Sequence, residues 1–182
     1  MATTAPATRD GRAALLRSAD GARPRTIAHR VLDRLLGAAE EINGGERCPT
    51  YLYRWELLSI ARLKRSTRVY LHKFVGDDWS LDLHDHPKRF WSIGLLGRYL
   101  EHRGDGSTRE YRAPWIRSFP AEHRHRLTGP TPARPCWTLV IVGTPTRNWG
   151  FWHRGSFIPW RNYVAPDSAE AAASLSCAGG DR

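Results

Sequence analysis

The sequence predicts one all-β domain preceded by an amphipathic helix. Beyond residue 50, short runs rich in Val, Ile, Leu, Tyr, Phe and Trp alternate with Gly, Pro and Asp. This pattern is typical of many short strands joined by turns, as in a sandwich or barrel. Near the N-terminus, apolar residues recur instead at helical spacing. The 182 residues, 41% hydrophobic and 25% charged, are enough for one globular domain with a substantial core.

The region before the strands divides into two parts. Residues 1–24 carry few bulky apolar side chains, and we expect them to be disordered. Residues 25–45 are predicted to form the helix, which Thr26 can cap and Asn-Gly-Gly at 43–45 can end. Its apolar side chains share one stripe: Ile27, Val31, Leu32, Leu35, Leu36 and Ile42. We expect this helix to pack on the outside of the β domain.

The β domain is predicted to span residues 46–163. Its candidate strands are Thr67–Val75, Ser80–Leu83, Phe90–Leu96, Arg98–His102, Arg109–Arg112, Trp115–Phe119, Arg124–Thr128, Trp137–Gly143, Arg147–Trp152 and Phe157–Tyr163. Residues 164–182 are rich in Ala, Ser and Gly, and we expect them to form a disordered tail.

Charge and cysteine content limit the partners and the compartment. The net charge is +10, but the basic residues, mostly Arg, are scattered without a long run, so nucleic-acid binding is not favoured. No apolar run approaches the about 20 residues that cross a membrane, so no membrane partner is expected. Cys48, Cys136 and Cys177 are an odd number without metal-binding spacing. They favour a reducing cytoplasm over a disulfide framework, and we therefore expect a cytoplasmic protein.

Two pairs of histidines carry the most specific chemical signal. In a strand, side chains at i and i+2 project to one face, so His84 and His86 can meet one metal ion. His123 and His125 form a second such pair on a later strand, with a pair of surface histidines as the alternative. Asp85 points to the opposite face and is expected to be structural. His29, on the predicted helix, is expected to be solvated.

The spacing around these pairs resembles the two sequence motifs of the cupins. The first motif has HxH, then a glutamate and a glycine. His84-Asp85-His86 matches HxH and Gly97 matches the glycine, but Phe90 stands at the glutamate. In the second motif, Pro120 and His125 match the proline and the histidine. The other fixed positions of both motifs differ.

The resemblance covers roughly residues 67–145 and implies a double-stranded β-helix, the cupin or jelly-roll barrel. It also implies a divalent metal held by His84, His86 and His125. With Phe90 in place of the glutamate, the site resembles the three-histidine site of thiol dioxygenases. The implied function is that of an Fe(II) oxygenase or dioxygenase, with Zn, Ni or Mn as alternative metals. A cation without a carboxylate ligand favours a small anionic substrate, a thiol or a carboxylic acid.

Two other functions fit the same resemblance. One is a metal-dependent isomerase or lyase that needs no oxygen, and the other is a small-molecule-binding cupin without turnover. By analogy with cupins that pair through sheet edges, a homodimer is a further expectation.

Four more residues are candidates for the surroundings of the metal. Phe90 would shape the pocket beside it. Glu101 could reach inward from the next strand as a replacement ligand, or remain an exposed carboxylate at an edge. His72 could hydrogen-bond a ligand imidazole, or simply pack in the barrel. His123 could replace His125 if the strand register slips by two residues.

Overall fold

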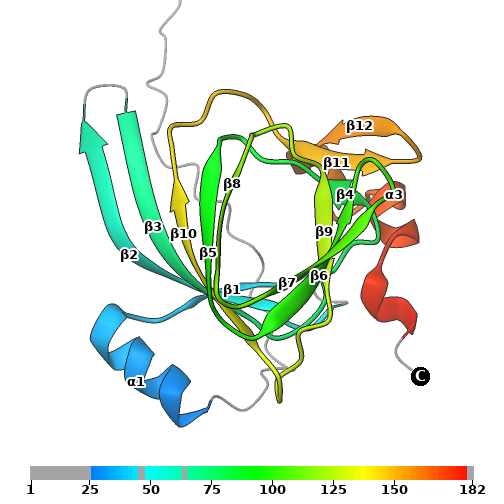
Figure 1. The fold of residues 1–182 in the computed structure, drawn as a ribbon. Helices are drawn as coiled ribbons and strands as arrows, with labels where there is room; N and C mark the ends of the chain where they lie inside the picture. Colours follow the sequence, from blue (N-terminus) through cyan, green and yellow to red (C-terminus); the bar gives the residue numbers. More distant parts are fainter. Residues whose placement is uncertain (1–25, 45–47, 63–64, 180–182) are drawn as a thin grey trace, which may run out of the picture.

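The computed structural model describes residues 26–44, 48–62 and 65–179, which form two six-stranded antiparallel sheets (Figure 1). Sheet 1 has the order β1 (Glu40–Ile42), β2 (Leu52–Arg62), β3 (Arg65–Phe74), β10 (Cys136–Val142), β5 (Phe90–Leu96) and β8 (Trp115–Phe119). Sheet 2 has the order β12 (Ser156–Pro159), β11 (Gly150–His153), β4 (Leu83–His84), β9 (His125–Thr128), β6 (Arg98–Arg103) and β7 (Thr108–Arg112).

The eight strands from β3 to β10 define the fold. Sheet 1 aligns the first, eighth, third and sixth of them, and sheet 2 aligns the second, seventh, fourth and fifth. This alternation between two facing sheets is the strand order of a jelly roll, or double-stranded β-helix. The predicted fold class is therefore confirmed. The helix α1 (Ile27–Leu36) lies outside the barrel, as expected.

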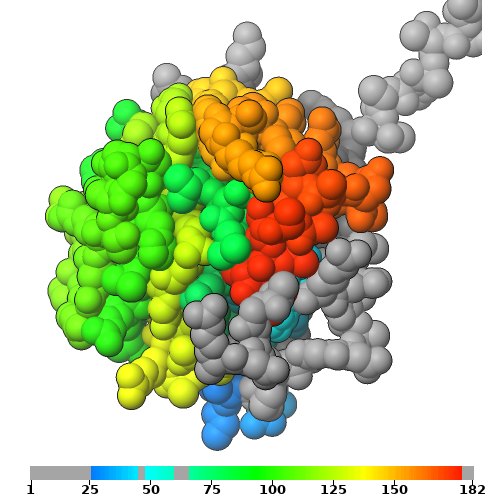
Figure 2. Space-filling view, turned by 90° about the vertical axis from the view of Figure 1, so that its right-hand side faces the viewer, coloured from blue at the N-terminus to red at the C-terminus, as the bar shows by residue number. Residues whose placement is uncertain are grey.

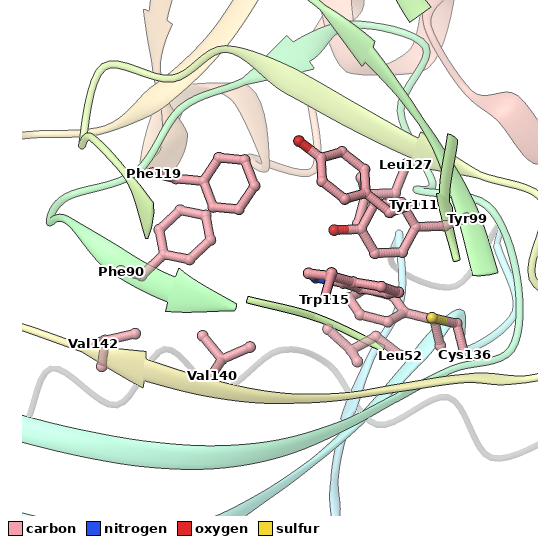
Figure 3. Packing of buried hydrophobic residues seen from close by; sticks show 11 residues of the cluster. Leu52, Phe90, Tyr99, Tyr111, Trp115, Phe119, Leu127, Cys136, Val140 and Val142 are labelled. Atoms are coloured by element: carbon pink, nitrogen blue, oxygen red, sulfur yellow. The ribbon is translucent and has the colours of Figure 1, made fainter. Parts of the chain in front are cut away.

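Aromatic side chains fill much of the space between the two sheets (Figure 3). Phe90 and Phe119 stack with their ring centroids 5.0 Å apart. Tyr99, Tyr111 and Trp115 form a second group, in which each ring contacts the other two. The inward-facing positions of both sheets thus form one apolar core, and the polar side chains described below are embedded in it.

The helix α1 is shorter than the predicted range of 25–45. Thr26 caps it as expected, because its hydroxyl accepts the backbone N–H of His29 at 3.3 Å. The helix ends at Gly37, whose φ of 86° is a conformation that favours glycine. The following segment forms β1, where Ile42 pairs with Leu52 of β2. Pairing with a strand later in the chain therefore overrides the helical spacing of Ile42.

The side of α1 that packs against the sheet also differs from the prediction, because it carries the histidine of the helix. His29, expected to be solvated, is 1% exposed, and its ring lies edge-on to Tyr53 and Trp55 of β2. Asp33, one turn further, accepts the indole N–H of Trp55 at 3.0 Å. By contrast Ile27, on the apolar stripe, is 73% exposed. Besides Leu32, the helix packs on β2 through the polar His29 and Asp33, because β2 presents aromatic rings and an indole donor to it.

The prediction of a disordered tail over 164–182 is wrong for the residues up to 179. The segment forms α3 (Ala169–Ala173) and a short 3₁₀ helix, η1 (Ser176–Gly179), after α2 (Trp160–Tyr163). It lies on the surface beside β11 and β12 (Figure 2). Backbone hydrogen bonds run from Leu81 N–H to Ser174 at 2.6 Å and from Ser176 N–H to Trp79 at 2.8 Å. These partners are almost 100 residues away, so local composition does not reveal them. The predictions for 1–24 and for 180–182 lie outside the described residues.

A disulfide joins this tail to the segment after β1. Cys48 and Cys177 are bonded, with their Cα atoms 5.7 Å apart across 129 residues of sequence, and Cys136 is free and buried. The cysteines were expected to indicate a reducing compartment, and this disulfide contradicts that expectation, because the fold brings two distant cysteines together. Disulfides are typical of oxidising compartments, so the cysteines no longer support a cytoplasmic location. Among the described residues, no helix has the length and apolarity to cross a membrane.

Candidate metal centre

Three histidines from two adjacent strands converge at one point of sheet 2. His84 ends β4 and pairs directly with His125, the first residue of β9. His86 follows two residues after His84, so it returns to the same face. The ring centroids lie 5.2 Å apart for His84 and His86, and 5.0 Å apart for each of these with His125. The three imidazoles therefore form a nearly equilateral group.

The nitrogen atoms of this group suit a single metal ion. One ring nitrogen from each histidine lies within 4.8 Å of the others, and the Nε2 atoms of His86 and His125 are 2.9 Å apart. Two imidazole nitrogens bound at about 2.1 Å and at right angles would be about 3 Å apart. The observed separation thus fits neighbouring ligand positions around one divalent ion.

Burial keeps the imidazoles of His86 and His125 in the neutral form that binds metals. Desolvation lowers the pKa of His86 well below its usual range, and the adjacent His125 and His84 rings lower it further. Desolvation also lowers the pKa of His125 to about 4, against the opposing effect of a hydrogen bond to Glu101. Near neutral pH both rings are therefore uncharged, with lone pairs available for a metal.

Glu101 of β6 reaches inward and is fully buried, so it is no exposed edge carboxylate, but it is not in the set with His84 and His86 that a replacement ligand would join. Its Oε1 accepts hydrogen bonds from His125 Nδ1 and His123 Nε2, both at 2.8 Å. Arg103 Nε donates to its Oε2 at 2.6 Å. Burial opposes the charge on Glu101, but these hydrogen bonds hold its pKa well below the usual range. The carboxylate thus fixes the proton of His125 on Nδ1 and leaves Nε2 free to face His86.

His123 lies next to the three-histidine group without joining it. It forms a second possible ligand set with Glu101 and His125. However, Arg103 already neutralises Glu101, and a second dication beside that guanidinium would be repelled. We therefore interpret Glu101, His123 and Arg103 as a hydrogen-bonded network behind His125.

Phe90 closes one side of the group. Its ring centroid is 4.5 Å from that of His86, and the ring also stacks on Phe119. The position where the cupin motif has a glutamate therefore carries an apolar aromatic side chain, which cannot bind a metal. Among the described residues, the set around His84 and His86 contains no carboxylate.

His72 does not act as the hydrogen-bond partner of a ligand imidazole. It lies on β3 opposite Thr138 of β10, with its ring against Phe74 and Tyr70. Within the part of the chain that the structure describes, its Nε2 is buried without a hydrogen-bond partner. Desolvation lowers the pKa of His72 to about 3, with a smaller contribution from Arg54. The packing interpretation of His72 therefore fits the structure better than the interpretation as a ligand partner.

Two residues that position the histidines were missed from the sequence. Arg103 follows Glu101 by two residues on β6, so it projects to the same interior face. Asp78 accepts the backbone N–H of Leu127 at 2.8 Å, which fixes β9, and lies 3.7 Å from His84 Nδ1. The alternation along β6 is a signal for Arg103, whereas nothing local marks Asp78. Asp85 is structural as expected, since it accepts the backbone N–H of Gly150 at 2.9 Å.

Strand order and site together define the class: a double-stranded β-helix, which is the cupin fold, with three converging histidines. Comparison with solved structures finds weak similarities. The polyketide cyclase RemF from Streptomyces resistomycificus is 18% identical over 69% of this chain and 84% of its own, with a TM-score of 0.45. An uncharacterized protein with a double-stranded β-helix domain from Klebsiella pneumoniae is 16% identical over 54% of this chain and 81% of its own, with a TM-score of 0.42.

A structure described as DMSP lyases RdDddP and RnDddQII is 24% identical, with a TM-score of 0.40. This match spans 50% of the present chain and 46% of the lyase chain. No protein-family model matches the chain, and no curated protein matches it. The fold assignment accordingly depends on the strand order, and the site must be interpreted from its own residues.

Proposed function

We propose that this protein is a mononuclear metal-dependent enzyme of the cupin fold, with His84, His86 and His125 as metal ligands. The ion we propose is Fe(II), and the reaction is oxygenation of a small anionic molecule, a thiol or a carboxylic acid. The observation that carries the proposal is the convergence of three imidazoles, with two Nε2 atoms 2.9 Å apart and no carboxylate in the set.

The donor set supports a cationic centre. Because all three ligands are neutral, an ion held by them would keep its full +2 charge and supply open positions for an anionic substrate and for O₂. The chain itself would hold His125 in one tautomer through Glu101, and would exclude water on one side with the rings of Phe90 and Phe119. Arg103 adds a positive charge behind Glu101.

A second candidate is a metal-dependent isomerase or lyase that needs no oxygen. The observation in its favour is the hydrogen-bonded pair of Glu101 and His123, 2.8 Å apart and next to the ligand His125. The imidazole of His123, held in place by Glu101, offers the general base that isomerisation and elimination require. Zn, Ni or Mn would serve this chemistry as well as iron.

The experiment that tests the proposal is elemental analysis of protein purified without a metal-affinity tag. The variants are His84→Ala and His125→Ala, with His102→Ala as the matched control. His102 lies on the same sheet but hydrogen-bonds Thr128 and Thr108 instead. Near-stoichiometric iron that is lost in both site variants and kept in the control would support the ligand assignment.

Oxygen-uptake screening with thiols and small carboxylic acids then separates the two reactions. Turnover that consumes O₂ supports the oxygenase, and turnover under anaerobic conditions supports the isomerase or lyase. Binding of a small anion without turnover would favour a non-catalytic cupin. Absence of metal in folded wild-type protein would overturn the whole proposal.

A further inference from the structure

Three buried polar atoms on the inner face of sheet 1 have no hydrogen-bond partner anywhere in the described chain. They are Nε2 of His72, Oγ1 of Thr138 and Nε1 of Trp115. His72 of β3 pairs with Thr138 of β10, and Thr138 pairs in turn with Gly94 of β5. Gly94 pairs with Trp115 of β8. Because residues paired across antiparallel strands project to the same face, the three atoms belong to one row across the sheet.

Gly94 allows the indole of Trp115 to lie across this row. A Cβ at position 94 would overlap the Trp115 ring, so the ring occupies the place where a side chain of β5 would otherwise project. Figure 3 shows the indole nitrogen at the end of the ring that is nearer to Phe90 than to Cys136. The N–H of Trp115 therefore lies on the side of the ring that faces Phe90.

The row lies within reach of the metal centre along the barrel interior. Phe90, whose ring centroid is 4.5 Å from that of His86, precedes Gly94 by four residues on the same inward face of β5. Four residues of a strand span about 13 Å. Besides burial and the nearer histidines, His72 lowers the pKa of His86, so the two imidazoles interact electrostatically across the barrel. A molecule that is bound to the metal and extends along β5 beyond Phe90 therefore reaches the row.

Unpaired polar atoms in a protein interior are unfavourable unless something binds them. A buried donor or acceptor loses its contacts with water, and most buried polar groups in proteins are therefore hydrogen-bonded. Val140 and Val142 occupy the next inward positions of β10 after Thr138, so this face accommodates hydrocarbon without such a cost. Three polar side chains on one row beside these valines indicate a binding partner with hydrogen-bonding atoms.

The row carries no net charge. His72 is neutral near pH 7, because burial lowers its pKa to about 3. Trp115 can only donate, and the hydroxyl of Thr138 can donate or accept. Arg54 of β2, which pairs with His72 at the end of the row, binds the carboxylate of Glu40 through Nε at 3.0 Å and Nη2 at 2.7 Å. Neutral groups of this kind suit an uncharged polar group, whereas a buried carboxylate would need a cation of its own.

We propose that His72, Thr138 and Trp115 bind an uncharged polar group at the far end of a substrate whose anionic end binds the metal. The inference rests on the proposed function and narrows its substrate class. A metal–ligand distance of about 2 Å and a hydrogen bond of about 3 Å leave about 8 Å of the span of about 13 Å. That length corresponds to about six bonds of an extended chain. The expected substrate is an acid or a thiol with a hydroxyl, carbonyl or amide group at about that distance.

Calorimetric titration of the Fe(II)-loaded full chain, in the absence of oxygen, tests this inference with hexanoate, 6-hydroxyhexanoate and hexanedioate. We expect 6-hydroxyhexanoate to bind roughly tenfold more tightly than the other two acids, because only its far end is both polar and uncharged. Thr138→Val and Trp115→Phe should each abolish this preference and leave the affinity for hexanoate unchanged. Thr108→Val is the matched control and should keep the preference, since Thr108 is exposed on β7 and hydrogen-bonds His102.

Melting temperatures of the full chain without any acid test the row independently of the metal. Thr138→Val keeps the shape of the side chain and removes an unpaired hydroxyl, so it should melt about 2–4 °C higher than the wild type. Thr144→Val should melt lower, because the Thr144 hydroxyl accepts the backbone N–H of Ser66 at 3.1 Å.

Equal affinities for the three acids, or a lower melting temperature in Thr138→Val, would overturn the inference and leave the metal centre intact. Absence of bound metal would overturn the proposed function, and the melting temperatures would then decide the inference alone.

Discussion

The buried carboxylate of Glu101 provides a sharp test of how this site is held together. It accepts hydrogen bonds from His125 and His123 at 2.8 Å and from Arg103 at 2.6 Å. Glu101→Gln keeps the shape of the side chain but removes the charge. The amide oxygen can remain towards the two histidines, and the amide NH₂ then faces the Arg103 N–H. Two donors would oppose each other where an ion pair exists in the wild type.

The expected loss has two parts. Removing one partner of a buried ion pair costs about 3–5 kcal/mol when nothing replaces it. Gln retains one acceptor oxygen, and Arg103 is 22% exposed to water, so we expect the folded state to lose about 1–3 kcal/mol. With its orientation loosened, His125 should bind metal about ten- to a hundredfold more weakly, the usual effect of losing the partner of a ligating histidine.

Chelator competition for the metal, together with urea denaturation of the metal-free protein, measures both parts. Glu110→Gln is the matched control, because Glu110 is exposed and pairs with Arg98 and Arg112 on the outside of the barrel. Its metal affinity and urea midpoint should match those of the wild type within error. If Glu101→Gln also leaves both quantities unchanged, Glu101 does not position His125 and the network interpretation is wrong.

Three further predictions concern the rest of the fold. His72 has a pKa of about 3 in the folded protein, against about 6.5 when unfolded, so below pH 6.5 the unfolded state takes up a proton that the folded state does not. The stability that His72 contributes is therefore lost as pH falls. In His72→Phe, the unfolding free energy measured by urea denaturation should decline less steeply between pH 6.5 and 4.5, by up to about 1.4 kcal/mol per pH unit. Parallel plots of unfolding free energy against pH for the two proteins would contradict this. Cys177→Ser removes a disulfide that spans 129 residues and should lower the unfolding free energy by about 2–5 kcal/mol. A dithiol reductant should have the same effect on the wild type. Equal denaturation midpoints for the variant and the wild type would show that the disulfide does not restrain the tail. Gly94→Ala should lower the melting temperature markedly, because the Cβ of the new alanine would overlap the ring of Trp115. Gly143→Ala is the control and should have almost no effect, because its Cβ would make only ordinary contacts. Similar melting temperatures for the two variants would refute the packing argument.

Several features of the fold were predictable because they depend on neighbours in the sequence. Alternation of apolar residues with turn residues predicted the strands β5, β8 and β10 near their observed bounds. Thr26 was predictable as the helix cap, since capping involves a residue and the next turn. The tail was not predictable, because its hydrogen bonds reach residues 79–81, far away in the chain.

The metal centre separates in the same way. The sequence by itself determined that His84 and His86 share a face, and likewise His123 and His125, because side chains two residues apart in an extended chain project to the same side. The motif spacing already favoured His125 over His123, and the tertiary structure supplies the physical reason, since His84 pairs with His125 across β4 and β9. Only the tertiary structure decided that Glu101 points inward, because period-two alternation leaves open which face is buried until the sheet closes into a barrel.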